Sequence, residues 1–142
     1  MKKIIGITLV VLLALFVLIQ FIPFGHQHTN PPVVSEPNWD SPQTKELARR
    51  ACFDCHSNET VWPWYSNIAP VSWLVQSDVD EGRQYLNFSD WGRVREANEI
   101  PEVIQSGYMP PSQFLIMHPE ARLTQAEKDA LISGMQATVS GQ

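Results

Sequence analysis

The hydrophobic and polar positions divide the chain into an apolar amino-terminal run and a longer, mixed remainder. Apolar residues fill positions 4–22 except at Gly6, Thr8 and Gln20. At about 1.5 Å rise per residue, such a helix spans about 28 Å, close to the hydrocarbon thickness of a bilayer. The run exceeds the roughly 7–15 apolar residues of a cleaved signal peptide, and no small-x-small cleavage site follows it. We therefore predict an uncleaved membrane anchor over residues 1–24, with a cleaved signal peptide as the alternative.

Positive charge flanks this run on one side only. Lys2 and Lys3 precede it, and the next lysine or arginine is Lys45. Basic residues near a membrane span stay preferentially on the cytoplasmic side. The predicted topology is therefore single-pass in the cytoplasmic membrane, with the rest of the chain on the periplasmic or extracytoplasmic side.

Residues 25–40 show neither helical nor alternating periodicity and contain several prolines. This pattern predicts a stiff linker between the anchor and one small domain, residues 41–142. Two histidines of the linker, His26 and His28, are predicted to be solvated, because a metal site needs further converging ligands.

The pattern after residue 40 is helical. Ser41 and Pro42 suit the N-cap and the first helical position, so a helix is predicted to begin there and to bring Cys52 near its end. Val71, Leu74, Val75 and Val79 have helical spacing and predict a second helix, from about Val71 to Gly82. Gly82 is predicted to end that helix.

A capping box marks the start of the last predicted helix. Thr124 is followed three residues later by Glu127, so the helix is expected to run from Gln125 to about Thr138. No segment alternates convincingly between apolar and polar residues, as a half-buried strand would. The fold class predicted for residues 41–142 is therefore all-α.

The candidate chemistry lies in one short segment, Cys52-Phe53-Asp54-Cys55-His56. Two cysteines three positions apart, followed directly by histidine, have the spacing that attaches a c-type haem. One helical turn presents both thiols to the two haem vinyl groups, and the next imidazole becomes the proximal ligand of the iron. The alternatives are a disulfide, which in thioredoxin-like sites follows a strand, and a zinc site, which needs about four ligands.

The predicted cofactor is one covalently bound haem c. Cys52 and Cys55 are the only cysteines of the chain, so only one haem can be attached through two thioethers. Trp62, Trp64 and Tyr65 supply flat apolar area, which would cover one side of the haem or fill the core. We expect a small cytochrome c-like helical domain around this haem.

Three downstream residues are candidates for the sixth ligand of the iron. Met109 follows Gly107 and precedes two prolines, which stiffen the loop, and cytochromes c commonly use such a methionine. Met117 lies in an apolar run and is predicted to belong to the core. His118 could reach the iron or cap a helix. We predict Met109 as the distal ligand, with Met117, His118 and an open position as alternatives.

The net charge of the chain excludes few classes of binding partner. The chain has 15 acidic and 10 basic residues, a formal net charge of −5. This balance makes nucleic acid an unsuitable partner and favours solubility and docking to basic surfaces. Apart from the membrane, the partners expected are redox proteins that the sequence does not identify.

From residue 41 to the last helix, the sequence resembles the bacterial haem-binding domain family of small, membrane-anchored, c-type cytochrome-like proteins. The similar segments are residues 51–60, 62–66, 68–73, 109–111 and 118–123. The resemblance implies haem binding through Cys52, Cys55 and His56. It names no pathway and adds little on the sixth ligand.

These observations predict a mono-haem electron carrier rather than an enzyme. An iron held by both His56 and Met109 has no vacant position for a substrate, and thioether ligation raises its potential. The alternative is a peroxidase-like enzyme or a ligand or redox sensor with an open or labile sixth position. A third possibility is a scaffold in which the haem is structural.

Overall fold

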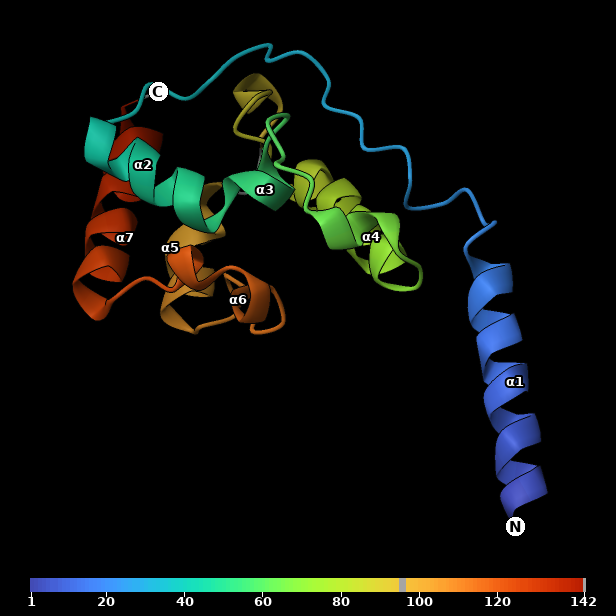
Figure 1. Ribbon diagram of the computed structural model, residues 1–142. Helices are drawn as coiled ribbons and strands as arrows, with labels where there is room; N and C mark the ends of the chain where they lie inside the picture. Colours follow the sequence, from blue (N-terminus) through green and yellow to red (C-terminus); the bar gives the residue numbers. More distant parts are fainter. Residues whose placement is uncertain (95–96, 142) are drawn as a thin grey trace. The chain divides into compact units, whose positions relative to one another are not determined.

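The computed structural model describes residues 1–94 and 97–141, and the regular elements within these ranges are all helices, joined by irregular segments (Figure 1). The described residues contain no strand, only an isolated bridge between Ser35 and Asp90. The predicted all-α class is confirmed. The elements are α1 (Lys2–Ile19), α2 (Pro42–Ala51), α3 (Phe53–His56), η1 (Trp64–Asn67), α4 (Val71–Tyr85), η2 (Trp91–Arg93), η3 (Ala97–Glu99), α5 (Ile100–Gln105), α6 (Phe114–Met117), η4 (Pro119–Ala121) and α7 (Gln125–Ser140).

Helix α1 matches the predicted apolar run. It has 18 residues with a mean hydropathy of 2.5, and none of its residues is buried. By length and composition it is able to cross a membrane, a test that the apolar part of a signal sequence also passes.

The chain forms two compact units. The first comprises residues 1–29 and 62–78, and the second comprises residues 30–61 and 79–142. Helix α4 is continuous and contributes its first half to one unit and its second half to the other.

Part of the predicted linker belongs to the second unit. Residues 30–40 form no helix, but the Val34 amide donates to the Ser89 carbonyl at 2.8 Å and the Trp91 amide donates to the Ser35 carbonyl at 3.0 Å. The side-chain amide of Asn58 donates to the Pro32 carbonyl at 2.9 Å. These bonds hold the segment against its own unit.

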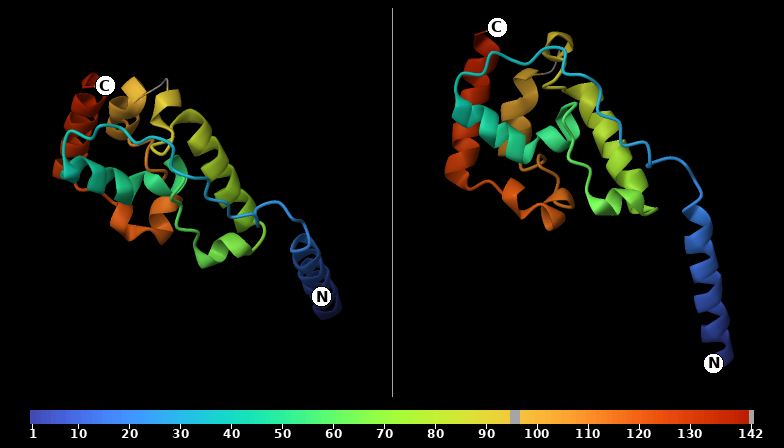
Figure 2. Two further views of the ribbon diagram at one scale, coloured as in Figure 1. Left: turned by 90° about the horizontal axis from the view of Figure 1, so that it is seen from above. Right: turned by 45° about the horizontal axis from the view of Figure 1, so that its top comes forward.

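The core of the second unit lies among α2, α5 and α7, and α7 lies beside both α2 and α5 (Figure 2). The Ser41 hydroxyl accepts from the Thr44 amide, with Pro42 next to it in the first turn, as predicted. The Thr124–Glu127 capping box starts α7, also as predicted. The buried apolar residues of this core are Leu47, Ala48, Ala51, Phe53, Phe88, Ala97, Ile100, Ile104, Leu123, Leu131 and Met135.

One expectation about α4 is corrected by the structure. The helix does not end at Gly82 but continues to Tyr85. A Cβ at Gly82 would lie 2.9 Å from the carbonyl carbon of Cys55, so this glycine permits a close approach of backbones rather than a helix end. The apolar spacing correctly marks a helix, yet Val71 and Leu74 are exposed whereas Ser72 and Gln76 are buried.

Candidate functional site

The cysteines and the histidine of the motif lie on one turn of backbone at the junction of α2 and α3. Cys52 caps the carboxyl end of α2, and the amides of Cys55 and His56 donate to its carbonyl at 3.2 and 2.9 Å. Both cysteines are half-buried as whole residues, and no disulfide joins them. Burial, and then the neighbouring Cys55, raise the pKa of Cys52 to about 12. These backbone bonds place Cys52, Cys55 and His56 on one turn, and their role in holding a haem stays a prediction.

The imidazole of His56 is oriented by the carboxyl end of α4. Its Nδ1 lies 2.9 Å from the Gly82 carbonyl oxygen and 3.1 Å from the Leu86 carbonyl oxygen. Carbonyl oxygens only accept hydrogen bonds, so Nδ1 carries the proton and Nε2 keeps its lone pair. Burial lowers the pKa of His56, although the bonds to Leu86 and Gly82 oppose this. A neutral ring with its second nitrogen fixed is the form of histidine that binds metals.

Gly82 makes this contact possible. The position has no side chain, and α4 passes so close to α3 that a methyl group would meet the Cys55 carbonyl carbon at 2.9 Å and its Cβ at 3.1 Å. Carbonyl groups at the carboxyl end of a helix are open to partners from outside the helix. Here the Leu86 carbonyl, one residue beyond the end of α4, accepts a hydrogen bond from the ring. Sequence reasoning interpreted Gly82 only as a stop signal and missed this role.

Arg83 fixes the segment that follows the motif. Its Nε donates to the Ser57 carbonyl at 2.8 Å, and a terminal nitrogen donates to Thr60 Oγ1 at 2.9 Å. Thr60 in turn donates to the Asp54 carbonyl at 2.8 Å, so the bonds close back onto the motif. Nothing in the sequence distinguishes Arg83 from other helical arginines, because its partners lie 23 and 26 residues away.

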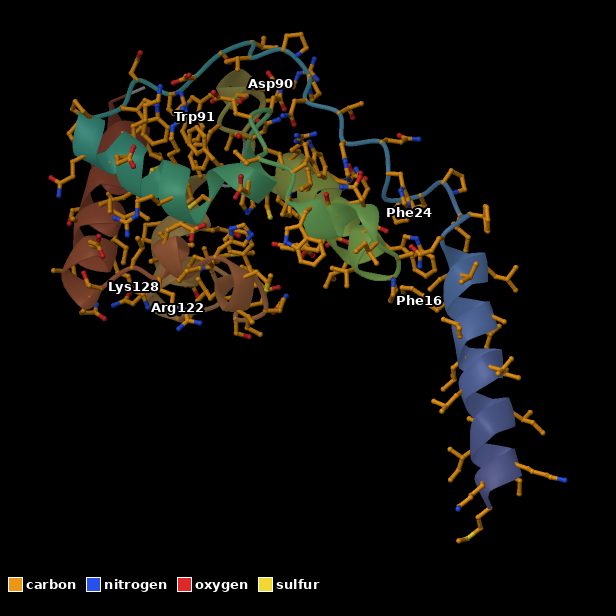
Figure 3. The ribbon with its side chains drawn as sticks, viewed as in Figure 1. Phe16, Phe24, Asp90, Trp91, Arg122 and Lys128 are labelled. Carbon is orange, nitrogen blue, oxygen red and sulfur yellow. The ribbon has the colours of Figure 1, made fainter. Side chains whose placement is uncertain are left out.

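Phe53, which lies between the two cysteines, attaches the motif to the core. Its ring stacks on Phe88 with centroids 5.3 Å apart, and the Arg49 guanidinium lies 4.8 Å above it. Phe88 also stacks on Trp91, which Figure 3 labels beside Asp90 in the turn after α4. Because Phe53 is buried, rotation of the motif turn would expose a large aromatic surface.

Met109, the predicted distal ligand, lies in the same unit as the motif. It is half-buried after α5, and its amide donates to the Val103 carbonyl at 3.0 Å. The turn before it contains Gly107 with φ of +75°, a backbone conformation that favours glycine. These features hold Met109 in place and leave its role as a ligand a prediction.

The two alternatives to Met109 lie on or next to α6. Met117 is 51% exposed, so the prediction that it belongs to the core is wrong. Helix α6 is a single turn, and its half-buried residues are Phe114 and Leu115, which leaves Met117 outward. His118 stacks on Phe114 at 4.0 Å, and its Nδ1 lies 3.0 Å from Glu120 Oε1 and 4.0 Å from Asp54 Oδ2. His118 therefore lies beside the motif and stays an alternative.

The two histidines predicted to be solvated, His26 and His28, are partly buried within the first unit. His28 stacks on Trp62 at 4.6 Å, and its Nε2 lies 2.9 Å from the Ser66 carbonyl oxygen. His26 Nε2 is buried without a hydrogen-bond partner. The prediction of solvation is wrong because this part of the chain packs onto a later segment, which local composition does not indicate.

The comparisons with known proteins bear on the cofactor. The sequence model of a family described as the haem-binding domain matches residues 14–137, which is most of the chain. Neither the curated proteins nor the solved structures give a match. The family match covers α2 and α3, which carry the motif, as well as α4, whose carboxyl end orients His56. The chain therefore belongs to the haem-binding domain family, and haem is its cofactor.

Proposed function

We propose that this protein is a mono-haem, c-type cytochrome-like electron carrier, held by residues 1–24 at the outer face of the cytoplasmic membrane. The observation that carries the proposal is the orientation of His56. Its Nδ1 is bonded to the Gly82 and Leu86 carbonyls, which leaves Nε2 as the ligating nitrogen directly after two thiols that no disulfide blocks.

The residues of the motif fit a covalently bound haem. Cys52 and Cys55 would hold the haem through two thioethers, each formed by adding the S–H of one thiol across one vinyl group without a net change of oxidation state. The bound group supplies an iron that exchanges single electrons. His56 Nε2 would hold the iron, and the carbonyl bonds to Nδ1 would increase the basicity of the ring.

Met109 completes the proposed set of ligands. Its thioether would occupy the distal position and leave no place for a substrate, which favours transfer of electrons over catalysis. The half-buried side chain, held after the Gly107 turn, supports this role. The electron donors and acceptors are redox proteins or membrane components of unassigned identity.

Location is proposed from charge and helix length. Lys2 and Lys3 would stay on the cytoplasmic side of α1, and the two units would follow outside. This is also the side on which c-type haem is attached in bacteria. Protease added to spheroplasts should therefore digest the haem domain while the cells remain intact.

Acid–acetone extraction of the purified chain, followed by optical redox titration, tests the function. The haem should stay on the polypeptide, and the resting spectrum should be that of six-coordinate, low-spin iron that titrates with one electron. Cys52→Ser should leave a single thioether and serves as the matched control. Complete release of haem, with both thiols open to alkylation, would contradict covalent attachment. High-spin iron that binds carbon monoxide or peroxide rapidly would instead support the enzyme or sensor alternative.

A further inference from the structure

The first unit is almost devoid of charge. Residues 4–29 and 62–77 contain no lysine, arginine, aspartate or glutamate. These two stretches make up nearly all of the unit, which comprises residues 1–29 and 62–78. A surface that faces only water normally carries many charged side chains. The absence extends well beyond the helix that could cross the membrane.

The later stretch instead exposes large apolar side chains. Trp64 is 71% exposed and Leu74 is 50% exposed, and Ile68 and Val71 between them are also exposed. Val71 and Leu74 are three positions apart and share one side of the beginning of α4, and Ile68 lies just before this helix. Ala69, Ser72 and Gln76 are buried. This arrangement reverses that of a helix on a soluble domain, whose apolar side is normally covered.

This apolar patch, formed by Trp64, Ile68, Val71 and Leu74, is attached to the end of α1. The Gln20 side-chain amide donates to the Ala69 carbonyl at 3.0 Å, and its oxygen accepts from the Ala69 amide at 2.9 Å. Gly25 also packs against the backbone of Ser72 and Trp73.

Further apolar side chains surround this junction. Phe21, Ile22 and Phe24 are exposed beyond the end of α1. Figure 3 labels Phe16 and Phe24 at this end of the helix. The patch therefore lies next to the carboxyl end of α1, where further apolar side chains are exposed.

We propose that the apolar patch is a membrane-docking surface that enters the outer interface of the lipid bilayer. Tryptophan at 64 would lie at headgroup level, where aromatic side chains are favoured, and the aliphatic side chains would contact the acyl boundary. The inference rests on the proposed function in one respect, since it requires α1 to span the membrane. Because the unit has no charged side chains here, docking should depend on neither anionic lipids nor salt.

Photocrosslinking of the full chain in phosphatidylcholine liposomes tests the docking. The probe is a phosphatidylcholine with a diazirine next to the acyl carbonyl, and the labelled peptides are mapped by mass spectrometry. Crosslinks are expected on residues 64–74 as well as on α1, with the same yield in high salt.

Two double variants provide the comparison. In Trp64→Ser combined with Leu74→Ser, the yield on residues 64–74 should fall at least about tenfold, since two large apolar contacts are lost, while labelling of α1 persists. Val33→Ser combined with Val34→Ser removes exposed apolar residues of the second unit and should change neither yield. Both variants should retain the haem absorption bands of the wild type, because the substituted side chains are exposed.

Three results would overturn the docking surface. Labelling of α1 without labelling of residues 64–74 would refute the patch and leave the anchor intact. Absence of label on α1 would refute the spanning anchor and, with it, the location proposed above. An altered haem absorption band in the Trp64→Ser and Leu74→Ser variant, without loss of label, would place the patch against the haem instead of lipid.

Discussion

Replacing Gly82 with alanine has two opposite effects on the free energy of unfolding, a gain in helix propensity and a loss in packing. In an unobstructed helix, alanine is more favourable than glycine by about 1 kcal/mol. At this position the new methyl group would lie 2.9 Å from the Cys55 carbonyl carbon and 3.1 Å from its Cβ, atoms that no side-chain rotation can move away. Such overpacking costs about 1–3 kcal/mol, and a retreat of α4 also weakens two hydrogen bonds to His56, each worth about 1 kcal/mol. We expect a net loss of about 1–3 kcal/mol instead of a gain.

The reduction potential separates this effect from general destabilisation. The bonds from His56 Nδ1 to the Gly82 and Leu86 carbonyls increase electron donation by the ring, which stabilises the oxidised iron. Weaker bonds should therefore raise the potential in Gly82→Ala. The measurements are urea unfolding of the full chain in detergent and optical redox titration of the same sample.

Two other glycines serve as controls. At Gly134 a methyl group would meet Thr44 Cγ2 at 2.8 Å, so Gly134→Ala should lower stability through the contact of α7 with α2 while the potential stays unchanged. At Gly92 the nearest atom would be 3.9 Å away, and Gly92→Ala should be close to neutral in both measurements. A Gly82→Ala protein that is as stable as the wild type, with an unshifted potential, would refute the reasoning.

Three further predictions concern the ligand, the arginine and the last helix. Met109→Ala should abolish the sulfur-to-iron charge-transfer band of the oxidised protein and lower the potential, whereas Met117→Ala, at an exposed position, should do neither; the reverse pattern would contradict the assignment. Arg83→Lys should cost about 2–3 kcal/mol in urea unfolding, because an ammonium cannot replace the bonds to Ser57 and Thr60 together; an unchanged midpoint would refute this. Hydrogen bonds from the Thr124 amide and then from Arg50 lower the pKa of Glu127 from 4.5 to about 2. The wild type should therefore be more stable than Glu127→Gln above pH 4.5, and this difference should disappear as the pH falls to about 2. Urea unfolding midpoints measured across this pH range test the prediction.

Features set by neighbouring residues were predictable from the sequence. The N-cap at Ser41 and the capping box from Thr124 to Glu127 depend on atoms three residues apart, and both occur as expected. The motif of Cys52, Cys55 and His56 is equally local, since one turn of backbone brings its members together. The spacing of residues in such short motifs is enough to predict their local geometry.

Features set by distant contacts were not predictable in this way. Gly82 is a good helix terminator by its local preference, but its close approach to Cys55, 27 residues earlier in the chain, decides its actual role. Arg83 likewise acquires its role only through partners in the folded chain. Met117 belongs to an apolar run, yet a one-turn helix can cover only part of such a run. Periodicity identifies an element and does not state what covers each of its sides.

Helix α4 shows this limit along its own length. Its beginning exposes the apolar side chains of Val71 and Leu74 and buries Ser72 and Gln76, the reverse of the usual pattern of a helix that faces water. Its end presents the carbonyls of Gly82 and Leu86 to the His56 ring. One continuous helix thus carries two kinds of surface, and substitutions should separate by position. Changes at 71 and 74 should alter contact with lipid and leave the haem spectrum unchanged, whereas changes at 82 should alter the potential without affecting the labelling of α4 by lipid. If both effects followed from substitutions at either end, the two surfaces would not be independent, and the separate roles assigned to them here would have to be merged.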